Sequence, residues 1–220
     1  MTKAMMMLAA SAALVCGAGT AAAQSRGSQE DIAPGGFGND VVAARRSTPA
    51  GEGPAVFGKC AVDADRAGAT ALLDAKIGSG ESKNAAKKLA DKKTSCGAMI
   101  GRDRSEEIVR GATARQLYTE TYAAAPAPLT SEPAPFQGSG DPSLVQYDLA
   151  SCAVTRDPVA ADALVRAAEG SAEERTAFPA VVAAVGRCTP NGAKIGFSKA
   201  QLRAGVAEGL WAYRKGMAAR

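Results

Sequence analysis

The chain has 220 residues, a formal net charge of +4 and no histidine. The missing histidine excludes Ser-His-Asp and Cys-His catalysis and all imidazole metal sites. The small, mixed charge argues against nucleic-acid binding, which needs a larger and clustered basic surface. We therefore expect no cofactor, no metal and no nucleic-acid partner.

The first 23 residues have the pattern of a secretory signal peptide. Lys3 precedes an apolar run from Met5 to Val15, and three alanines at 21–23 form a small-residue cleavage site. This run is too short for an ordinary transmembrane helix, which disfavours an uncleaved anchor, and no later segment is long and apolar enough to span a bilayer. A lipoprotein would need a small residue before Cys16, where the chain has Val15. We expect an exported, periplasmic protein.

Residues 24–54 are polar and rich in Gly and Pro, and we expect them to be disordered. The rest of the chain contains an internal repeat. A shift of 92 residues superimposes Cys60 on Cys152 and Cys96 on Cys188, and a shift of 93 aligns Arg110 with Arg203 further on. This many matches in register predicts a duplication, with repeat 1 at 55–122 and repeat 2 at 147–220. The Pro/Ala/Ser-rich residues 123–146 between them are a predicted linker.

Each repeat has the start and stop signals of three helices, so the predicted fold is mainly α. In repeat 2, Asp157-Pro158, Ser171 and Ser198 are the expected helix starts, and Pro179 predicts a kink or break in the second helix. The corresponding helices of repeat 1 are expected at 66–77, 82–94 and 105–122. Short strands are expected before Cys60 and Cys152 and at 195–197.

The four cysteines that remain after signal removal should be oxidised in an exported protein. Four cysteines allow three pairings. A short turn between the first two helices of each repeat would bring together the cysteines that flank this hairpin. We therefore predict the bridges Cys60–Cys96 and Cys152–Cys188, each worth about 3–4 kcal/mol. The wide spacing fits neither a C-x-x-C redox motif nor a zinc site.

The repeat resembles a set of uncharacterised exported bacterial proteins. Their shared pattern is a Cys-x-Val start, an alanine-rich segment, a Gly-Ser-x-x-Glu turn, a second Cys and a Leu-Arg…Ala-Glu-x-Leu-aromatic helix. This chain carries it as Cys152-Ala153-Val154, Ala163-Leu164-Val165, Gly170-Ser171-Ala172-Glu173-Glu174, Cys188 and Leu202-Arg203…Ala207-Glu208-Gly209-Leu210-Trp211. The first repeat departs from it, with Arg115 where the second has Glu208. The resemblance implies no activity.

Two sets of basic residues are candidate contacts for an anion or a partner. The equivalent Arg110 and Arg203 should lie along a helix surface and pair with an acid. The other set is a basic helix face that is either solvated or in contact with anionic envelope polymers or lipid headgroups, made of Lys87, Lys88, Lys92 and Lys93. The matching positions of repeat 2 are mostly apolar, and we expect that surface to pack on repeat 1 or on a partner: Pro179, Ala180, Ala184 and Val185.

The carboxylates give no convincing catalytic pair. Glu106 and Glu107 are neighbours in the first turn of a helix, where acids stabilise the helix dipole and adjacent side chains do not face the same way. The sequence therefore favours a non-catalytic envelope interaction or structural protein. The alternatives are a carboxylate hydrolase of envelope polymers and a periplasmic protein that binds a small ligand or responds to stress.

Overall fold

A computed structural model describes residues 53–190, 193 and 196–216. The predicted signal peptide and nearly all of the segment 24–54 lie outside these residues. The helices are α1 (Pro54–Ala64), α2 (Arg66–Asp74), α3 (Gly80–Leu89), α4 (Ser95–Met99), α5 (Glu106–Thr121), α6 (Val145–Arg156), α7 (Pro158–Arg166), α8 (Ala172–Cys188) and α9 (Lys199–Arg214), with a 3-10 turn η2 at Pro142–Leu144 before α6. The mainly α prediction is confirmed.

The strands expected before the first cysteine of each repeat are wrong, because both segments are helices. Cys60 lies within α1 and Cys152 within α6. Phe57, Ala61 and Val62 are spaced for one helical face and are buried, so a short apolar run that resembled a strand is a packed helix. Each half therefore has one more helix at its start than we predicted. The strand expected at 195–197 lies partly outside the described residues, and Gly196 and Phe197 are in neither a helix nor a strand.

Three pairs of equivalent helices in the two halves start with the same capping residue. Asp65 and Asp157 close α1 and α6 and accept a hydrogen bond from the first turn of α2 and α7, with nearly identical backbone angles. Ser79 and Ser171 cap α3 and α8, and Ser105 and Ser198 cap α5 and α9. These local starts agree with the duplication inferred from the sequence.

The second helix of each repeat differs between the halves. We expected a kink or break in that of repeat 2, but the break occurs in repeat 1. The helix α8 runs through Pro179 without a break, whereas the matching part of the first half is divided into α3 and α4. Pro179 has no backbone N–H to donate to the Arg175 carbonyl, but both residues are exposed, so water can satisfy that carbonyl. In the first half, Thr94 starts a new helix by accepting a hydrogen bond from Gly97 N, and Asp91 accepts one from Lys93 N.

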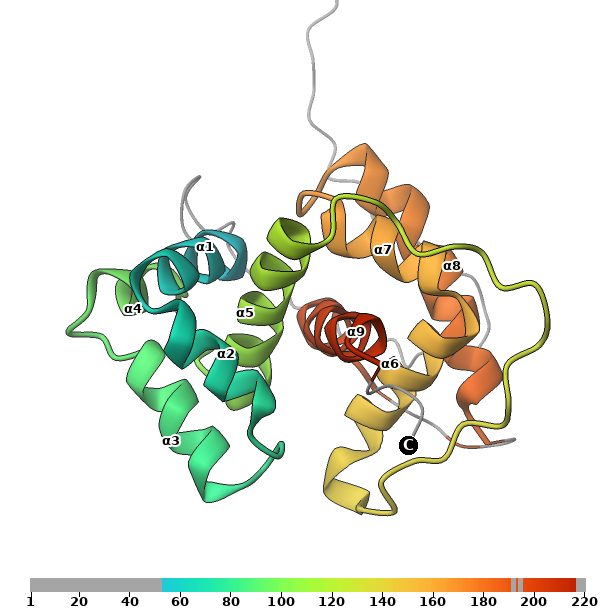
Figure 1. Ribbon diagram of the computed structural model, residues 1–220, viewed down its shortest axis with the longest axis horizontal. Helices are drawn as coiled ribbons and strands as arrows, with labels where there is room; N and C mark the ends of the chain where they lie inside the picture. The colour runs from blue at the N-terminus through green and yellow to red at the C-terminus, as the bar shows by residue number, and fades with distance from the viewer. Residues whose placement is uncertain (1–52, 191–192, 194–195, 217–220) are drawn as a thin grey trace, which may run out of the picture. The chain divides into compact units, whose positions relative to one another are not determined.

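The halves pack directly on each other through α5 and α9. In Figure 1, α9 is seen nearly end-on beside α5 and α6, and it contacts α5, α6 and α7. The contact is close because Gly111 has no side chain: a Cβ there would overlap with Ala204. The predicted linker ends earlier than expected, since α6 begins at Val145. It is held against α6 by Ser139–Asp148 hydrogen bonds and a Glu132–Arg156 ion pair.

Candidate functional site

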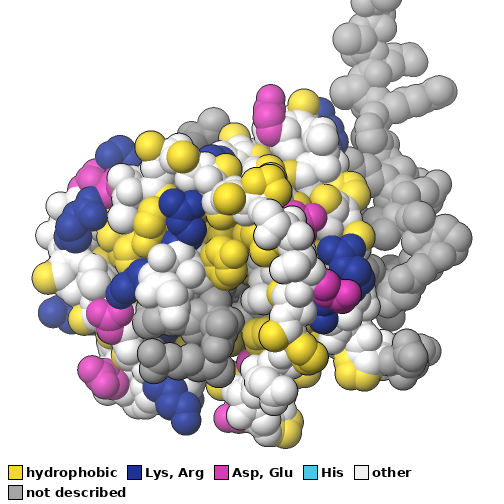
Figure 2. All heavy atoms as spheres, turned by 45° about the vertical axis from the view of Figure 1, so that its right-hand side comes forward, with side chains coloured by type: hydrophobic (Ala, Val, Ile, Leu, Met, Phe, Trp, Pro, Cys, Tyr) yellow, Lys and Arg dark blue, Asp and Glu magenta, His cyan; other side chains and the backbone are white. Residues whose placement is uncertain are grey.

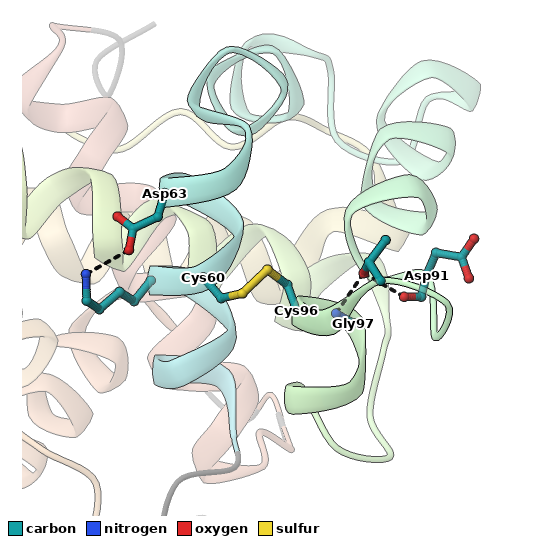
Figure 3. Close-up of a disulfide and its surroundings, with 7 residues drawn as sticks. Cys60, Asp63, Asp91, Cys96 and Gly97 are labelled. Atoms are coloured by element: carbon teal, nitrogen blue, oxygen red, sulfur yellow. Dashed lines mark hydrogen bonds and ion pairs between the residues drawn. A yellow bond between two sulfur atoms is a disulfide. The ribbon is translucent and has the colours of Figure 1, made fainter.

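Both predicted disulfides are present. Cys60 and Cys96 join α1 to α4, and Cys152 and Cys188 join α6 to the end of α8, with Cα–Cα distances of 5.4 and 6.0 Å. Figure 3 shows the first bridge beside the Thr94–Gly97 cap of α4. The pairing is as predicted, but the cysteines do not flank a simple hairpin. Each bridge fastens the additional first helix to the rest of its half, so the cysteines have a structural role.

Arg110 and Arg203 pair with acids as expected but do not lie on the surface. Arg110 is only 2% exposed, and its guanidinium donates to Glu208, to Ser82 Oγ and to carbonyls of α2 and the turn after it. Arg203 is also buried and donates to Glu174 and to the Ala167 carbonyl. A guanidinium has five N–H donors, so when buried it can satisfy several carbonyls at once. At the surface, water would take the place of these carbonyls. Both arginines hold the interior together.

The two buried pairs balance charge differently. Glu174 belongs to the same half as Arg203, but Glu208 comes from the half opposite to Arg110. Burial raises the pKa of Glu174, but the Gly170 N–H, Lys199 and Arg203 outweigh this and leave the pKa below its ordinary value. Burial also raises the pKa of Glu208, which Arg110 offsets only in part, so that pKa lies above its ordinary value.

The structure also explains the departure noted at Arg115. A shift of 93 residues places Arg115 on Glu208, so the two sides of the α5–α9 contact carry opposite charges at one equivalent position. Arg115 Nε donates to Val165 O at 2.7 Å and Nη2 to Ala167 O at 3.3 Å. Ala167 O is also a partner of Arg203. The sequence analysis did not predict that Arg115 and Arg203 would lie together. The only trace of this contact in the sequence is the reversal of charge between Arg115 and Glu208.

Arg115 and Arg203 line a cavity of about 360 Å³ between the halves, which we call the inter-half pocket. Its walls are formed mostly by apolar residues of α5, α7 and α9, and its rim includes the start of α1. Lys199 at its edge forms an ion pair with Glu174 at 2.9 Å. Burial lowers the pKa of Arg115, and the neighbouring charge of Arg203 lowers it further. The pocket therefore combines apolar walls with three cations and two carboxylates, the latter being Glu169 and Glu174.

The adjacent carboxylates Glu106 and Glu107 point to different partners, as their helical positions predict. Glu106 accepts hydrogen bonds from Gly78 N and Ser82 Oγ within the first half. Glu107 accepts one from Gln201 of the second half, and burial raises its pKa despite that bond. Both carboxylates therefore fix neighbouring elements.

The predicted basic face is exposed on α3 and the following turn. We call it the lysine face: Lys87, Lys88, Lys92 and Lys93. Among the described residues none of the four takes part in an ion pair. On the face in Figure 2, basic, acidic and hydrophobic side chains are intermixed.

The apolar surface predicted for repeat 2 does not form one face. Ala184 and Val185 are buried on a helix, α8, that packs on α6 and α7 of the same half, whereas Pro179 and Ala180 are exposed. The expectation that Val185 packs on the first repeat or a partner is therefore wrong. Of the four residues, Ala184 and Val185 point into the core, and Pro179 and Ala180 face the solvent.

Over 53–190 and 196–216, no helix is long and apolar enough to cross a membrane, and no three His, Cys, Asp or Glu residues gather as metal ligands. Comparison of the chain with models of protein families, with curated proteins and with solved structures gives no match. The function is therefore argued from the residues of the chain itself.

Proposed function

We propose that the chain is an exported, non-catalytic protein of the cell envelope that contacts an anionic envelope component through the lysine face. The observation that carries the proposal is the exposure of four lysines that have no acidic partner among the described residues. A lysine near an anionic membrane surface contributes about 1 kcal/mol of binding free energy, so four together give useful affinity.

Two further features support this proposal. The disulfides favour an oxidising compartment such as the periplasm. The lysine face also has no counterpart in the second half, where the equivalent positions are Pro179, Ala180, Ala184 and Val185. A general requirement for solubility would act on both halves, so charge confined to one half is better explained by a directed contact.

The test is co-sedimentation of the purified, oxidised protein with vesicles that contain about one quarter anionic phospholipid, and separately with isolated sacculi. A variant with all four lysines changed to Gln should lose most of the bound fraction, and binding of the unmodified protein should fall as salt is added, because screening acts on exposed charges. Binding to the vesicles would identify the anionic component as lipid, and binding to the sacculi would identify it as polymer.

The matched control removes the same charge from other exposed positions, by Gln at Lys76, Arg102, Arg175 and Arg187. This variant should bind as the unmodified protein does. Equal binding by the lysine-face variant and its control in both arms would overturn the proposal.

A further inference from the structure

The inter-half pocket arises from a local two-fold relation between the halves. Gly111 and Ala204 are equivalent under the shift of 93 residues and touch each other where α5 and α9 cross. A contact between two equivalent residues places a local two-fold axis there. Every site on one side of the crossing therefore has a counterpart on the other, and the two can be compared residue by residue.

The counterpart site carries larger side chains at two positions. Where the pocket rim has Pro54 and Ala55, the equivalent positions carry Gln146 and Tyr147. Burial and the charge of Glu208 together raise the pKa of Tyr147 to about 12. The inter-half pocket has the smaller residues Pro54 and Ala55 at these two positions.

The two sites also differ in polarity at a second pair of equivalent positions. On the counterpart side Gln201 of α9 donates to Glu107 of α5 at 3.2 Å and so bridges the two helices. The equivalent residues on the pocket side are Ile108 and Ala200, which line the pocket and form no such bridge. At these two positions the pocket therefore has apolar walls.

The charges of the two sites are also unlike. On the counterpart side the cation of Arg110 is neutralised by Glu208. On the pocket side Glu208 is replaced by Arg115, and two guanidinium groups converge on Ala167 O. The buried Glu174 pairs with Arg203 and Lys199, and the second carboxylate of the lining, Glu169, is exposed. Arg115 donates to carbonyls and forms no ion pair among the described residues, so three cations face two carboxylates in the lining. A half-buried guanidinium that no carboxylate contacts favours an anion from outside.

We propose that the inter-half pocket binds a small organic anion, a monocarboxylate with an apolar chain, whose carboxylate pairs with Arg115 and whose chain lies against Leu164, Val165 and Ile108. The cavity of about 360 Å³ is at the small end of the range for small-molecule sites, and its few polar groups on otherwise apolar walls are typical of such sites. The ligand site is separate from the lysine face.

The test is calorimetric titration of the purified, oxidised protein with hexanoate, octanoate and decanoate below their micellar concentrations. Octylammonium is the probe with the same chain and the opposite charge. We expect at least one carboxylate to bind and to raise the unfolding temperature with concentration, and octylammonium to do neither. Arg115→Gln should weaken carboxylate binding at least tenfold, with a smaller loss for Arg115→Lys, which keeps the charge but not the planar fork.

A second variant tests the cavity without changing its charge. Ala55→Tyr introduces the side chain that the counterpart site carries and should abolish binding, whereas Val56→Tyr, at an exposed neighbouring position, should leave it intact. The proposal is overturned if no carboxylate binds, if octylammonium binds as tightly, or if Arg115→Gln and Ala55→Tyr, both folded by circular dichroism, bind as the unmodified protein. The lysine-face variant should keep carboxylate binding, so the two proposals can fail separately.

Discussion

At the scale of single residues, the buried charges decide how the two halves are held together. Arg110 draws its carboxylate from Glu208 in the opposite half, whereas Arg203 has Glu174 in its own. A buried ion pair gives little net stability, but removal of one partner leaves a charge that neither water nor protein neutralises. Removal of only one partner of the Arg110–Glu208 pair should therefore destabilise the protein more than removal of both.

Glu208→Gln should lower the free energy of unfolding by about 3–5 kcal/mol, because the Arg110 charge then stays buried without a carboxylate. Urea denaturation monitored by circular dichroism measures this change. The double variant Arg110→Met/Glu208→Leu should recover much of the loss, since it removes both charges. Asp63→Asn, which breaks the exposed Lys59–Asp63 pair, should cost less than about 1 kcal/mol. A loss for Glu208→Gln as small as that of Asp63→Asn would contradict this account.

At the scale of elements, the crossing of α5 and α9 depends on two small residues. The backbone of Ala204 occupies the space where Gly111 would have a side chain, so the helices approach more closely than ordinary side chains allow. Glycine costs helix stability in isolation, so this close packing must outweigh the intrinsic penalty. A glycine within α8, Gly186, provides the comparison, because nothing lies within 4 Å of the position of its missing Cβ.

Gly111→Ala should destabilise the protein by about 1–3 kcal/mol, since the added methyl group forces α5 and α9 apart. Gly186→Ala should stabilise it by up to about 1 kcal/mol, because alanine favours a helix and the site is open. Thermal unfolding of both variants measures the two changes. Shifts of the same sign would show that the α5–α9 contact is looser than described.

At the scale of the whole molecule, the halves form one packed structure within the described residues. The mostly exposed residues between Tyr122 and Asp141 connect them in sequence, but α5, α9 and the Arg110–Glu208 pair connect them in space. Each disulfide lies within one half, so no covalent bond other than the linker joins the two. The noncovalent contact should therefore survive without the linker.

A protease site inserted in the exposed stretch 127–131 should test this directly. After cleavage, the two fragments should elute together in size-exclusion chromatography, because the buried α5–α9 contact and its ion pair remain. They should separate in urea. Separation under native conditions would mean that the halves are independent units on a tether, as the linker composition alone suggests.

The residues of the sequence predicted much of the local structure and missed the way in which the halves meet. The starts of α2, α5, α7 and α9 follow from Asp and Ser caps, because a cap acts on its own first turn. The strands expected before Cys60 and Cys152 failed because a short apolar run has no unambiguous period. The continuity of α8 through Pro179 depends on exposure of that turn, which a sequence does not state.

The sequence by itself determined the helical class, the capped helix starts, both disulfide pairs and the lysine face, since these depend on local chemistry and on a repeat visible along the chain. Only the tertiary structure decided that Arg110 and Arg203 are buried, that Glu208 neutralises the arginine of the other half, and that Arg115 meets Arg203 in a pocket. The physical reason is that these contacts join residues up to 98 positions apart, so they exist only once α5 has packed on α9.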